Sequence, residues 1–209
     1  MENLRELLNS FTKEDYENNK VNLHIHTSCS DGEGNYKQIV EAAKSKGYKL
    51  ISITDHNTLE AHKNIQDEIL LTGIEFDCWF KGVFIHLLAY GIEVSDKNII
   101  PFLAKNTKDT KDVLPRLFSK RNVKDLIQAI HDSGGIAVLA HPACYWALSL
   151  EKLVVDLIKI GLDGIEVYYP YPNFRSIVKF HSSIKVLRIA EKYPQLIKTG
   201  GTDFHEKEF

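Results

Sequence analysis

The sequence predicts an α/β protein with a parallel β-sheet that is either open or closed into a barrel. Two observations lead to this prediction. Short apolar runs of strand character alternate with amphipathic helical stretches along the chain, and this alternation is typical of β–α units. In addition, histidines and carboxylates follow the apolar runs directly. The chemistry of α/β barrels lies at the carboxyl ends of their strands, so these polar residues stand where such a fold uses them.

The expected strands are short, apolar and rich in β-branched residues. They cover residues 21–26, 48–54, 83–90, 136–140, 164–168 and 195–199. The run at 48–54 has the continuous apolar character of a strand that is buried on both faces.

The expected helices lie between these strands. They cover residues 36–46, 57–70, 122–132, 150–160 and 177–192. Asn122 can cap the third of them, its apolar residues recur on one helix face, and Gly134 follows its end. Gly47 stops the first helix in the same way.

One domain accounts for most of the chain. The 209 residues, 44% of them hydrophobic, suit a single compact domain. Residues 1–20 form an N-terminal lead-in that is polar, with helical character over 4–11, and residues 21–209 form the domain. Residues 93–121 are polar and lysine-rich, and we interpret them as an excursion over the face that carries the polar residues.

Composition excludes several classes of protein. The net charge of −2 gives no general attraction to nucleic acid or to acidic membranes. No apolar run approaches the length of a membrane span, and the charged first residues do not resemble a signal peptide. The three cysteines, Cys29, Cys78 and Cys144, are widely spaced, which argues for a reducing compartment. We therefore expect a cytoplasmic protein with no membrane partner.

The most informative pattern is a pair of ligand-type residues near each end of the chain. His24 and His26 form one pair, and Asp203 and His205 form the other. Side chains at i and i+2 of a strand point to the same face, so each pair presents two metal ligands side by side. The sequence therefore predicts a metal site where the two ends of the fold meet.

Further residues of the same chemistry follow the other strands. The full candidate set is His24, His26, Asp31, His56, Glu75, His86, His141, Asp203 and His205. Each alone has an ordinary structural explanation, but together they would be costly to bury without a cation. The remaining histidines, His62, His131 and His181, lie in helical stretches among polar residues and are interpreted as surface residues.

The ligand types indicate which ions the site would hold. Histidine mixed with carboxylate, without clustered cysteine, fits Zn²⁺, Mn²⁺ or Fe²⁺. Nine ligands are too many for one ion, and three divalent ions are the natural count if one carboxylate bridges two of them. Such a centre attracts a phosphate dianion and lowers the pKa of a bound water, so a metal-bound hydroxide is the expected nucleophile. Phosphate ester hydrolysis is the reaction that needs both effects.

Four motifs, in order along the chain and the first of them in two parts, resemble those of the PHP family (polymerase and histidinol phosphatase). They are His24-x-His26-Thr27, Ser30-Asp31-Gly32, Thr54-Asp55-His56, Ala140-His141-Pro142 and Gly201-Thr202-Asp203-Phe204-His205. The resemblance spans residues 21–205. It implies a distorted seven-stranded (β/α) barrel of the TIM-like type, with a trinuclear metal site at the carboxyl face of its strands.

The resemblance also implies how the ligands divide among three ions. The implied sets are His24, His26, Glu75 and Asp203; Glu75, His86 and His141; and Asp31, His56 and His205. Glu75 would bridge the first two ions. Asp55 is expected behind the ligands, where it orients a histidine. Glu166 is expected near the site without being a ligand.

Within the family, residues 134–142 and 166–170 resemble a bacterial branch that hydrolyses nucleotides, 3′,5′-bisphosphates or short RNA 5′ ends. That branch carries a helical insertion between residues 90 and 122, where this chain has only a short segment. Arg116 and Arg121 flank the end of this segment, where the branch places a phosphate-contacting arginine. We take both as candidate substrate-binding residues, and a role as solvated surface charge is equally open for each.

Two alternatives remain open from the sequence. The chain can be a small-molecule phosphatase of the histidinol-phosphate type, or a noncatalytic metal-binding module of a larger assembly. All nine ligand positions are filled, which favours catalysis. The expected substrate is a phosphorylated small molecule, a nucleotide or an oligonucleotide, and no protein partner is identified. An aromatic group offers either a stacking surface for a base or ordinary packing: Trp146, Tyr168, Tyr169 and Tyr171.

Overall fold

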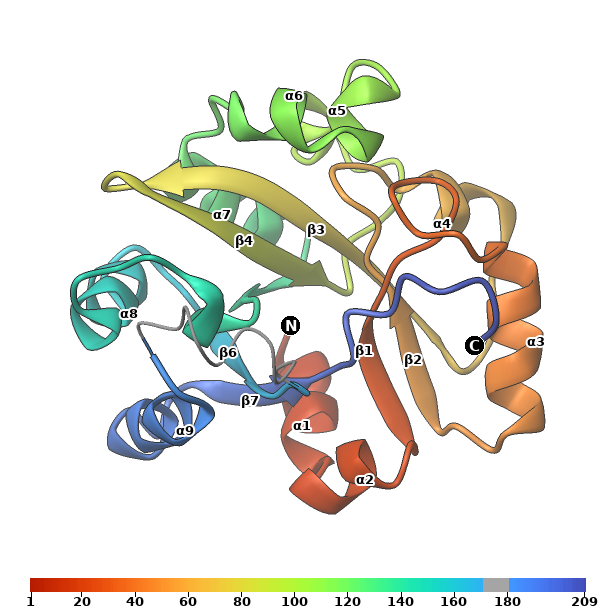
Figure 1. Cartoon of the computed structure of the whole chain (residues 1–209), viewed down its shortest axis with the longest axis horizontal. Coiled ribbons are helices and arrows are strands. Elements are labelled where there is room, and N and C mark those ends of the chain that lie inside the picture. Colours follow the sequence, from red (N-terminus) through yellow and green to blue (C-terminus); the bar gives the residue numbers. More distant parts are fainter. Residues whose placement is uncertain (171–180) are drawn as a thin grey trace.

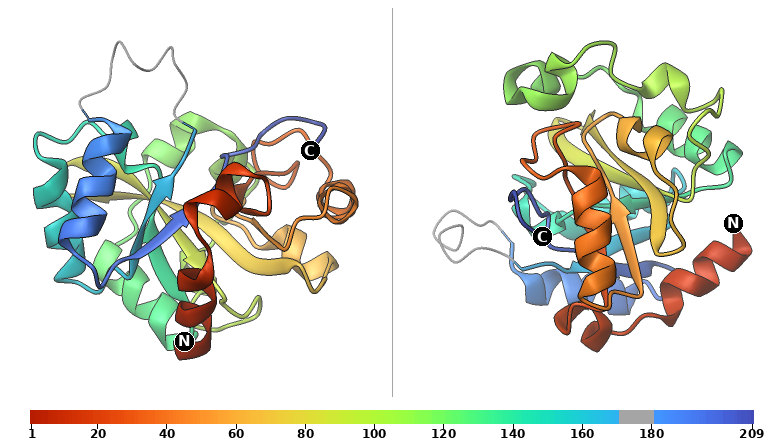
Figure 2. Two further views of the ribbon diagram at one scale, coloured as in Figure 1. Left: turned by 90° about the horizontal axis from the view of Figure 1, so that it is seen from below. Right: turned by 90° about the vertical axis from the view of Figure 1, so that its right-hand side faces the viewer.

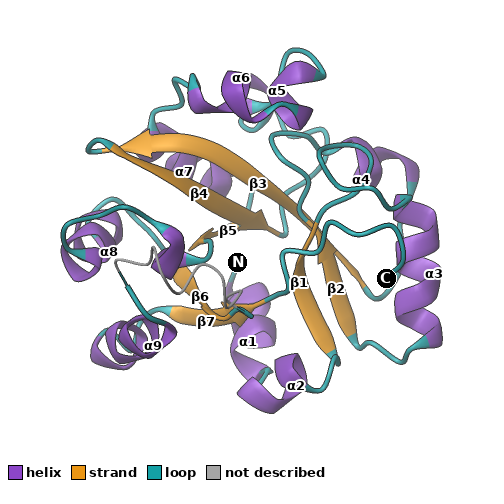
Figure 3. Ribbon diagram, in the orientation of Figure 1, coloured by secondary structure: helices purple, strands orange, loops and turns teal. Residues whose placement is uncertain are grey.

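The computed structural model describes residues 1–170 and 181–209. In this part of the chain seven strands form one sheet in chain order, which confirms the α/β class. The strands are β1 (Val21–Ile25), β2 (Leu50–Ile53), β3 (Leu70–Phe80), β4 (Val83–Tyr90), β5 (Ile136–Leu139), β6 (Gly164–Tyr168) and β7 (Ile197–Gly200). They stand around a ring with the helices on its outer side (Figures 1 and 3).

The strands are not all parallel, contrary to the expectation from sequence. β3 and β4 form an antiparallel hairpin, and β4 is also antiparallel to β5, whereas the other neighbouring strands are parallel. Lys81 and Gly82 form the turn, and both have positive φ angles, of 50° and 79°. Two such residues make the tight turn that joins antiparallel strands, whereas a parallel pair needs a long crossover.

The segment before the hairpin also differs from the predicted elements. The expected helix at 57–70 is only one short turn, α4 (Glu60–Asn64), and the long strand β3 that follows was not predicted. Between β2 and β3 the chain uses about a turn of helix where a βα unit usually has several.

The ring closes between β1 and the segment that follows β7. His26 donates its backbone N–H to the carbonyl of Phe204 at 2.8 Å, and Phe204 donates to the carbonyl of His24 at 3.2 Å. Beside this pairing, the Asn22 side chain donates to Thr202 Oγ1 at 2.7 Å and accepts the Thr202 N–H at 3.1 Å. These contacts bring residues near both ends of the chain together at the carboxyl end of β1.

The helices begin at polar caps where the sequence supplies them. They are α1 (Glu2–Ser10), α2 (Lys13–Glu17), α3 (Tyr36–Ser45), α4 (Glu60–Asn64), α5 (Lys108–Lys111), α6 (Val113–Leu117), α7 (Val123–Asp132), α8 (Leu150–Ile158) and α9 (Ser183–Lys192), with 3₁₀ turns η1 (Ile100–Phe102) and η2 (Pro142–Cys144). Asn35, Asn122, Ser149 and Ser182 each accept an N–H in the first turn of the helix that follows. The predicted helices at 36–46, 122–132 and 150–160 are confirmed. Residues 177–180 of the last predicted helix lie outside the described residues, and the helix begins at Ser183.

The N-terminal segment contributes to the core. Leu8 of α1 is fully buried, in one apolar cluster with Leu23 of β1, Leu88 of β4 and Ile197 of β7. The N-terminus lies at the opposite end of the ring from the C-terminal segment (Figure 2). Helix α1 therefore covers the end of the ring away from the polar residues, and the other end is left to the candidate site.

The excursion at 93–121 consists of short elements, η1, α5 and α6, of which α5 and α6 lie above β3 and β4 in Figure 1. Arg121 ties it to the sheet: its Nε donates to the carbonyl of Phe102 at 2.7 Å and its Nη1 to the carbonyl of Asp77 at 3.0 Å. Among the residues that the structure describes, none of the helices is both long and apolar enough to cross a membrane.

Candidate metal centre

The structure brings all nine candidate ligands together on the inner side of the ring. Each comes from a strand or from the residues soon after one: His24, His26 and Asp31 from β1 and its loop, His56 after β2, Glu75 from β3, His86 from β4, His141 after β5, and Asp203 and His205 after β7. This placement agrees with the prediction for the residues that follow β1, β2, β5 and β7, whereas Glu75 and His86 lie within the antiparallel strands β3 and β4.

Glu75 lies at the middle of the cluster and is fully buried. Its Oε2 lies 3.2–3.4 Å from the Nε2 atoms of three imidazoles, and its Oε1 lies 2.9–3.2 Å from nitrogens of two others. The three near Oε2 are His24, His26 and His56, and the two near Oε1 are His86 and His141. One carboxylate therefore contacts five imidazoles, as a bridging ligand would.

Among the described residues, four groups place three or more potential ligand atoms within 4.8 Å of one another. Two of them coincide with sets implied by the family resemblance: His24, His26, Glu75 and Asp203, and Glu75, His86 and His141. The third contains Asp31, His56 and His205 together with His26. The fourth, His56, Asp77 and His86, includes a carboxylate that the sequence analysis did not single out.

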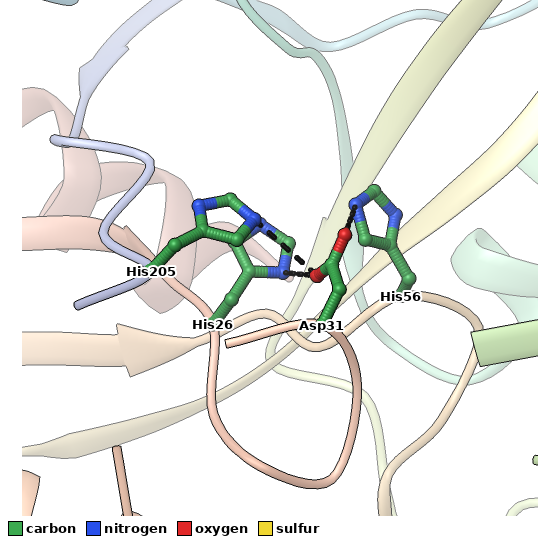
Figure 4. A group of neighbouring side chains, drawn as sticks. All are labelled: His26, Asp31, His56 and His205. Atoms are coloured by element: carbon green, nitrogen blue, oxygen red, sulfur yellow. Dashed lines mark ion pairs between the residues drawn. The ribbon is translucent and has the colours of Figure 1, made fainter. Parts of the chain in front are cut away.

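Asp31 lies between the histidines of the third group, with His56 on one side and His26 and His205 on the other (Figure 4). Its Oδ1 is 3.3 Å from His205 Nε2 and 3.6 Å from His26 Nδ1, and its Oδ2 is 3.7 Å from His56 Nε2. These separations leave room for a cation between the carboxylate and the rings.

The buried polar atoms of the cluster fit a bound cation. His24 Nε2, His26 Nε2 and Glu75 Oε2 are buried and have no hydrogen-bond partner among the described residues. Polar atoms buried in this way cost free energy unless something pairs with them. An ion between these atoms would satisfy all three, and imidazole mixed with carboxylate suits Mn²⁺, Zn²⁺ or Fe²⁺.

The pKa values of the cluster show that its carboxylates favour positive charge on their neighbours. Burial lowers the pKa of His26, but the Asp203 and Glu75 carboxylates outweigh it and raise that pKa to about 9. The pKa of His141 rises to about 10 in spite of its burial, through Cys144 and Glu75. Burial raises the pKa of Glu75, yet the surrounding histidines hold it well below its usual range. The carboxylates therefore stay ionised and attract protons or metal ions.

Two of the candidate ligands have unusual backbone conformations. His141 has a φ of 23° and Asp203 a φ of 51°, in the left-handed region that non-glycine residues rarely adopt. Such positions cost about 1–3 kcal/mol each and persist where the surroundings hold them. Glu166 holds the first by accepting the His141 N–H at 2.7 Å.

Glu166 is buried behind His24, on the side away from Glu75. Its Oε1 lies 3.0 Å from His24 Nδ1, while His24 Nε2 faces Glu75 and Asp203 at 3.4 Å each. A carboxylate behind a metal-binding imidazole fixes the ring and its tautomer. The structure thus places Glu166 beside a candidate ligand, as expected.

Asp55 contacts the loop that carries Asp31 rather than an imidazole. It accepts the N–H and the hydroxyl of Thr27, both at 2.7 Å, and the hydroxyl of Ser30 at 2.6 Å. Ser30 Oγ in turn lies 3.5 Å from His26 Nδ1. Any orientation of a histidine by Asp55 is therefore indirect, through this loop, and that role stays a prediction.

Asp77 is the residue of the site that the sequence analysis missed. It is fully buried on β3, two residues after Glu75, and the β3–β4 register places it opposite His86. Side chains at i and i+2 of a strand share a face, so the strand pattern would have placed Asp77 beside Glu75 had β3 been predicted.

The two candidate substrate-binding arginines have different surroundings. Arg116 of α6 is buried and donates from Nη1 to Asp31 Oδ2 at 2.6 Å. Arg121 donates to backbone carbonyls and to Ser119 Oγ, as a residue that stabilises the excursion would. The structure thus brings Arg116, and not Arg121, into contact with a candidate metal ligand.

Two of the histidines that were interpreted as surface residues are buried. His62 Nε2 lies 2.8 Å from the carbonyl of Ile53, and His181 Nε2 lies 2.7 Å from that of Ala147. Both predictions are wrong: a backbone carbonyl pairs with each ring nitrogen, which allows the polar ring to be buried. His131 is partly exposed and contacts Asp163.

The aromatic residues near the site have different surroundings. Tyr168 stacks on Tyr16, with ring centroids 5.2 Å apart, so it packs against the N-terminal segment. Tyr169 donates its hydroxyl to Asp203 Oδ2 at 2.9 Å. Trp146 is 72% exposed, and Tyr171 lies outside the described residues. A stacking surface for a base stays a prediction.

Comparison with known proteins gives a consistent picture. A model of the PHP domain matches residues 22–198. The chain is 22% identical to the phosphoribosyl 1,2-cyclic phosphate 1,2-diphosphodiesterase of Eggerthella lenta over 255 aligned residues. The alignment covers 88% of this chain and 94% of the relative. The chain is 28% identical, over 256 aligned residues, to the 5′-3′ exoribonuclease Rnm of Escherichia coli, with 88% and 84% covered. Both alignments run over more positions than this chain has residues, so both relatives contain residues that it lacks.

Solved structures share the fold. A proposed metal-dependent phosphoesterase from Bifidobacterium adolescentis aligns with a TM-score of 0.64 and 22% identity, over 88% of this chain and 87% of the other. An amidohydrolase from Chromobacterium violaceum, solved with bound sulfate, aligns with a TM-score of 0.74 and 18% identity, over 90% and 88%. At these identities the likeness concerns the fold alone.

Proposed function

This chain belongs to the PHP family and is a metal-dependent phosphoesterase, and from that premise we propose that it hydrolyses phosphate esters of nucleotides or short oligonucleotides. In this proposal three divalent ions, Mn²⁺, Zn²⁺ or Fe²⁺, occupy three ligand groups, two of which share Glu75. The observation that carries it is the contact of one buried carboxylate with five imidazoles. A noncatalytic module would not require ligand-type residues at all nine positions.

The bound ions would supply positive charge opposite the phosphate oxygens and a water molecule deprotonated near neutral pH. The protein's own part is to hold the ligands in place and to orient the ester. Tyr169 donates to the Asp203 oxygen that does not face His24, so the hydroxyl fixes this carboxylate. Burial of five of the nine ligands lowers the local polarity, which strengthens the attraction of bound cations for a phosphate, while the partly exposed Asp31, His86, Asp203 and His205 leave the centre open to a substrate.

A cavity beside the metal centre offers space for the rest of the substrate. It has a volume of about 400 Å³ and lies between the excursion and Asn57. Four cations line it, Lys105, Arg116, Lys120 and Arg121, with the carboxylate of Asp109 and the rings of Phe102 and Phe118. Cations suit further phosphates and aromatic rings suit a base, so this lining favours a nucleotide over a small uncharged alcohol.

Arg116 connects the cavity to the metal centre because it lines the first and contacts Asp31 in the second. A guanidinium in that position can donate two hydrogen bonds to one phosphate. We assign Arg116 to the scissile phosphate and Arg121 to the wall of the cavity, where it adds charge.

The test is hydrolysis of a panel of esters by the Mn²⁺-loaded protein, measured as inorganic phosphate released from monoesters and as nucleotides or opened ring released from diesters. The panel contains AMP, a 3′,5′-bisphosphate, a short 5′-phosphorylated RNA, phosphoribosyl 1,2-cyclic phosphate and histidinol phosphate. We expect the nucleotides or the RNA to have the highest kcat/KM. A preference for histidinol phosphate would contradict the proposed substrate class. No turnover of any ester with the ions bound would contradict catalysis and favour a noncatalytic module.

A further inference from the structure

Asp77 lies on the far side of two candidate ligand histidines from Glu75. Its Oδ1 is 3.4 Å from His56 Nδ1 and 3.2 Å from His86 Nε2. The other nitrogen of each ring faces the bridging carboxylate: His56 Nε2 is 3.3 Å from Glu75 Oε2, and His86 Nδ1 is 2.9 Å from Glu75 Oε1. Each of these two rings therefore stands between Glu75 and Asp77.

This arrangement meets a chemical requirement of metal-bound histidine. An imidazole that binds an ion through one nitrogen carries its proton on the other, and that N–H needs an acceptor. If His56 and His86 bind ions on the Glu75 side, their protons lie at Nδ1 and Nε2, and both face the same oxygen of Asp77. Neither His56 Nδ1 nor Asp77 Oδ1 has another hydrogen-bond partner within the described residues.

We propose that Asp77 is a positioning residue shared by two metal ions, which it serves by accepting the N–H of His56 and the N–H of His86 at one oxygen. The inference rests on the proposed function, since it takes these histidines as ligands of two different ions. Asp77 would fix the tautomer and the orientation of both rings, so that the two ions bind as a coupled pair.

The surroundings of Asp77 argue against the alternative that it binds an ion itself. Arg116 Nε lies 3.7 Å from the same Oδ1 and is one more donor on that side. Asn57 donates its amide to Asp77 Oδ2 and accepts the Asp77 N–H at 3.0 Å. Donors thus surround this carboxylate, as expected for a residue that accepts hydrogen bonds from ligands.

Asn57 also makes one substitution unusually informative. Its amide group is fixed because its oxygen already accepts the Asp77 N–H and its nitrogen donates to Asp77 Oδ2. In Asp77→Asn the new side-chain oxygen is drawn to the Oδ2 position, and the new NH₂ group then faces the two imidazoles and Arg116. The variant therefore replaces the shared acceptor by a donor at nearly constant volume.

The matched control is Glu166→Gln, which removes the charge of the carboxylate behind His24. We would measure the affinity for each Mn²⁺ or Zn²⁺ ion by competition with a chelator, and the ¹⁵N shifts of the histidine rings in the Zn²⁺-loaded protein. Asp77→Asn should weaken the ions at His56 and His86 by about 10- to 100-fold and leave the ion at His24 and Asp203 nearly unchanged. Glu166→Gln should weaken the ion at His24 and also the ion at His141, because Glu166 accepts the His141 N–H, and it should leave the ion at Asp31 and His56 nearly unchanged.

The wild-type spectrum tests the proposal even if Asp77→Asn fails to fold. It should show metal at His56 Nε2 and His86 Nδ1, with protons at His56 Nδ1 and His86 Nε2. Metal at the nitrogens that face Asp77 would overturn the proposal, and so would equal loss of all ions, or of none, in a folded Asp77→Asn. The ester panel decides the proposed function separately, because ion affinity and ring tautomers are measured without substrate.

Discussion

Arg116 and Asp31 form an ion pair within the metal centre, with Arg116 Nη1 2.6 Å from Asp31 Oδ2. Asp31 belongs to the loop after β1, whereas Arg116 belongs to α6 of the excursion, 85 residues further along the chain. Only 8% of Arg116 is exposed, so its charge is largely withheld from solvent. The excursion at 93–121 thus supplies a guanidinium that contacts the third ligand group.

This pair leads to the first prediction. Arg116→Ala should lower kcat/KM for the preferred ester by about 10- to 100-fold, because it removes a charged hydrogen-bond donor to the phosphate. Arg116→Lys should recover only part of the loss, since a lysine keeps the charge without the planar fork. Steady-state kinetics at saturating metal would measure both. Arg121→Ala is the control. It should lower the melting temperature, and its effect on kcat/KM should be smaller than that of Arg116→Ala. Wild-type kinetics in Arg116→Ala would contradict the assignment.

His141→Ala should strip one ion and nearly abolish hydrolysis while the fold is retained. His141 Nε2 lies 3.2 Å from Glu75 Oε1, in the group that also contains His86. Metal analysis, turnover and circular dichroism on the same sample would check the three parts. The control is His62→Ala, a buried histidine that contacts backbone groups of Ile53 and Gly73, which should lower stability but keep the full metal content. Near-wild-type turnover in His141→Ala would mean that the ligand assignment is wrong.

A chelator should inactivate the enzyme and also lower its thermal stability. Ions that bind only the folded protein stabilise it by about 3 kcal/mol when the free ion is 100-fold above its dissociation constant. Addition of Mn²⁺ or Zn²⁺ should restore both properties. Calorimetry and the ester assay on chelated and reloaded protein would test this, and full activity after exhaustive chelation would rule out a catalytic metal.

Gly201→Ala should weaken metal binding through the backbone. A Cβ atom at Gly201 would lie 2.4 Å from His24 Cβ and 2.6 Å from His24 N, which is too close for any rotamer change to relieve. The ring would have to open slightly where His24 faces the segment before Asp203. We expect weaker binding of the ion held by these two residues, measured by chelator competition. The control Gly134→Ala meets no neighbouring atom but has a φ of 80°, so it should cost stability without altering metal affinity. Unchanged affinity in Gly201→Ala would contradict the prediction.

The pair of His131 and Asp163 should make stability depend on pH. His131 Nε2 lies 2.7 Å from Asp163 Oδ2, and this contact raises the pKa of His131 above its usual 6.5 although burial opposes it. A raised pKa in the folded state means that the stabilisation is complete below about pH 6.5 and is lost as the pH rises through the folded pKa. His131→Gln should therefore lower the free energy of unfolding by about 1–2 kcal/mol at pH 6 and by less at pH 9. Urea unfolding at both values would measure this, and an equal loss at both would refute it.

Much of the fold and of the candidate centre could be predicted from the sequence because both follow short-range rules. Alternating apolar runs located six of the strands, and the pair His24 and His26 was placed by the i, i+2 rule of strands. Asp203 and His205 join the same cluster, but they lie in the segment after β7 and not in a strand as expected. The hairpin was missed because β3, which follows the expected helix at 57–70, was not predicted, although Ile74, Phe76 and Cys78 alternate with polar residues there as in a strand. Without β3, nothing in the sequence placed Asp77 next to Glu75 and opposite His86. The burial of His62 also depends on contacts that local patterns do not contain.

The closure of the ring between β1 and Phe204 has a consequence for how the protein keeps its shape. His24 and His26 lie on one side of this junction, and Asp203 and His205 lie on the other. A metal ion bound across it acts as a reversible cross-link between positions nearly the whole chain apart, and cross-links that close long loops remove the most freedom from the unfolded chain. Metal supply would then govern the resistance of the barrel to opening and proteolysis as well as its chemistry.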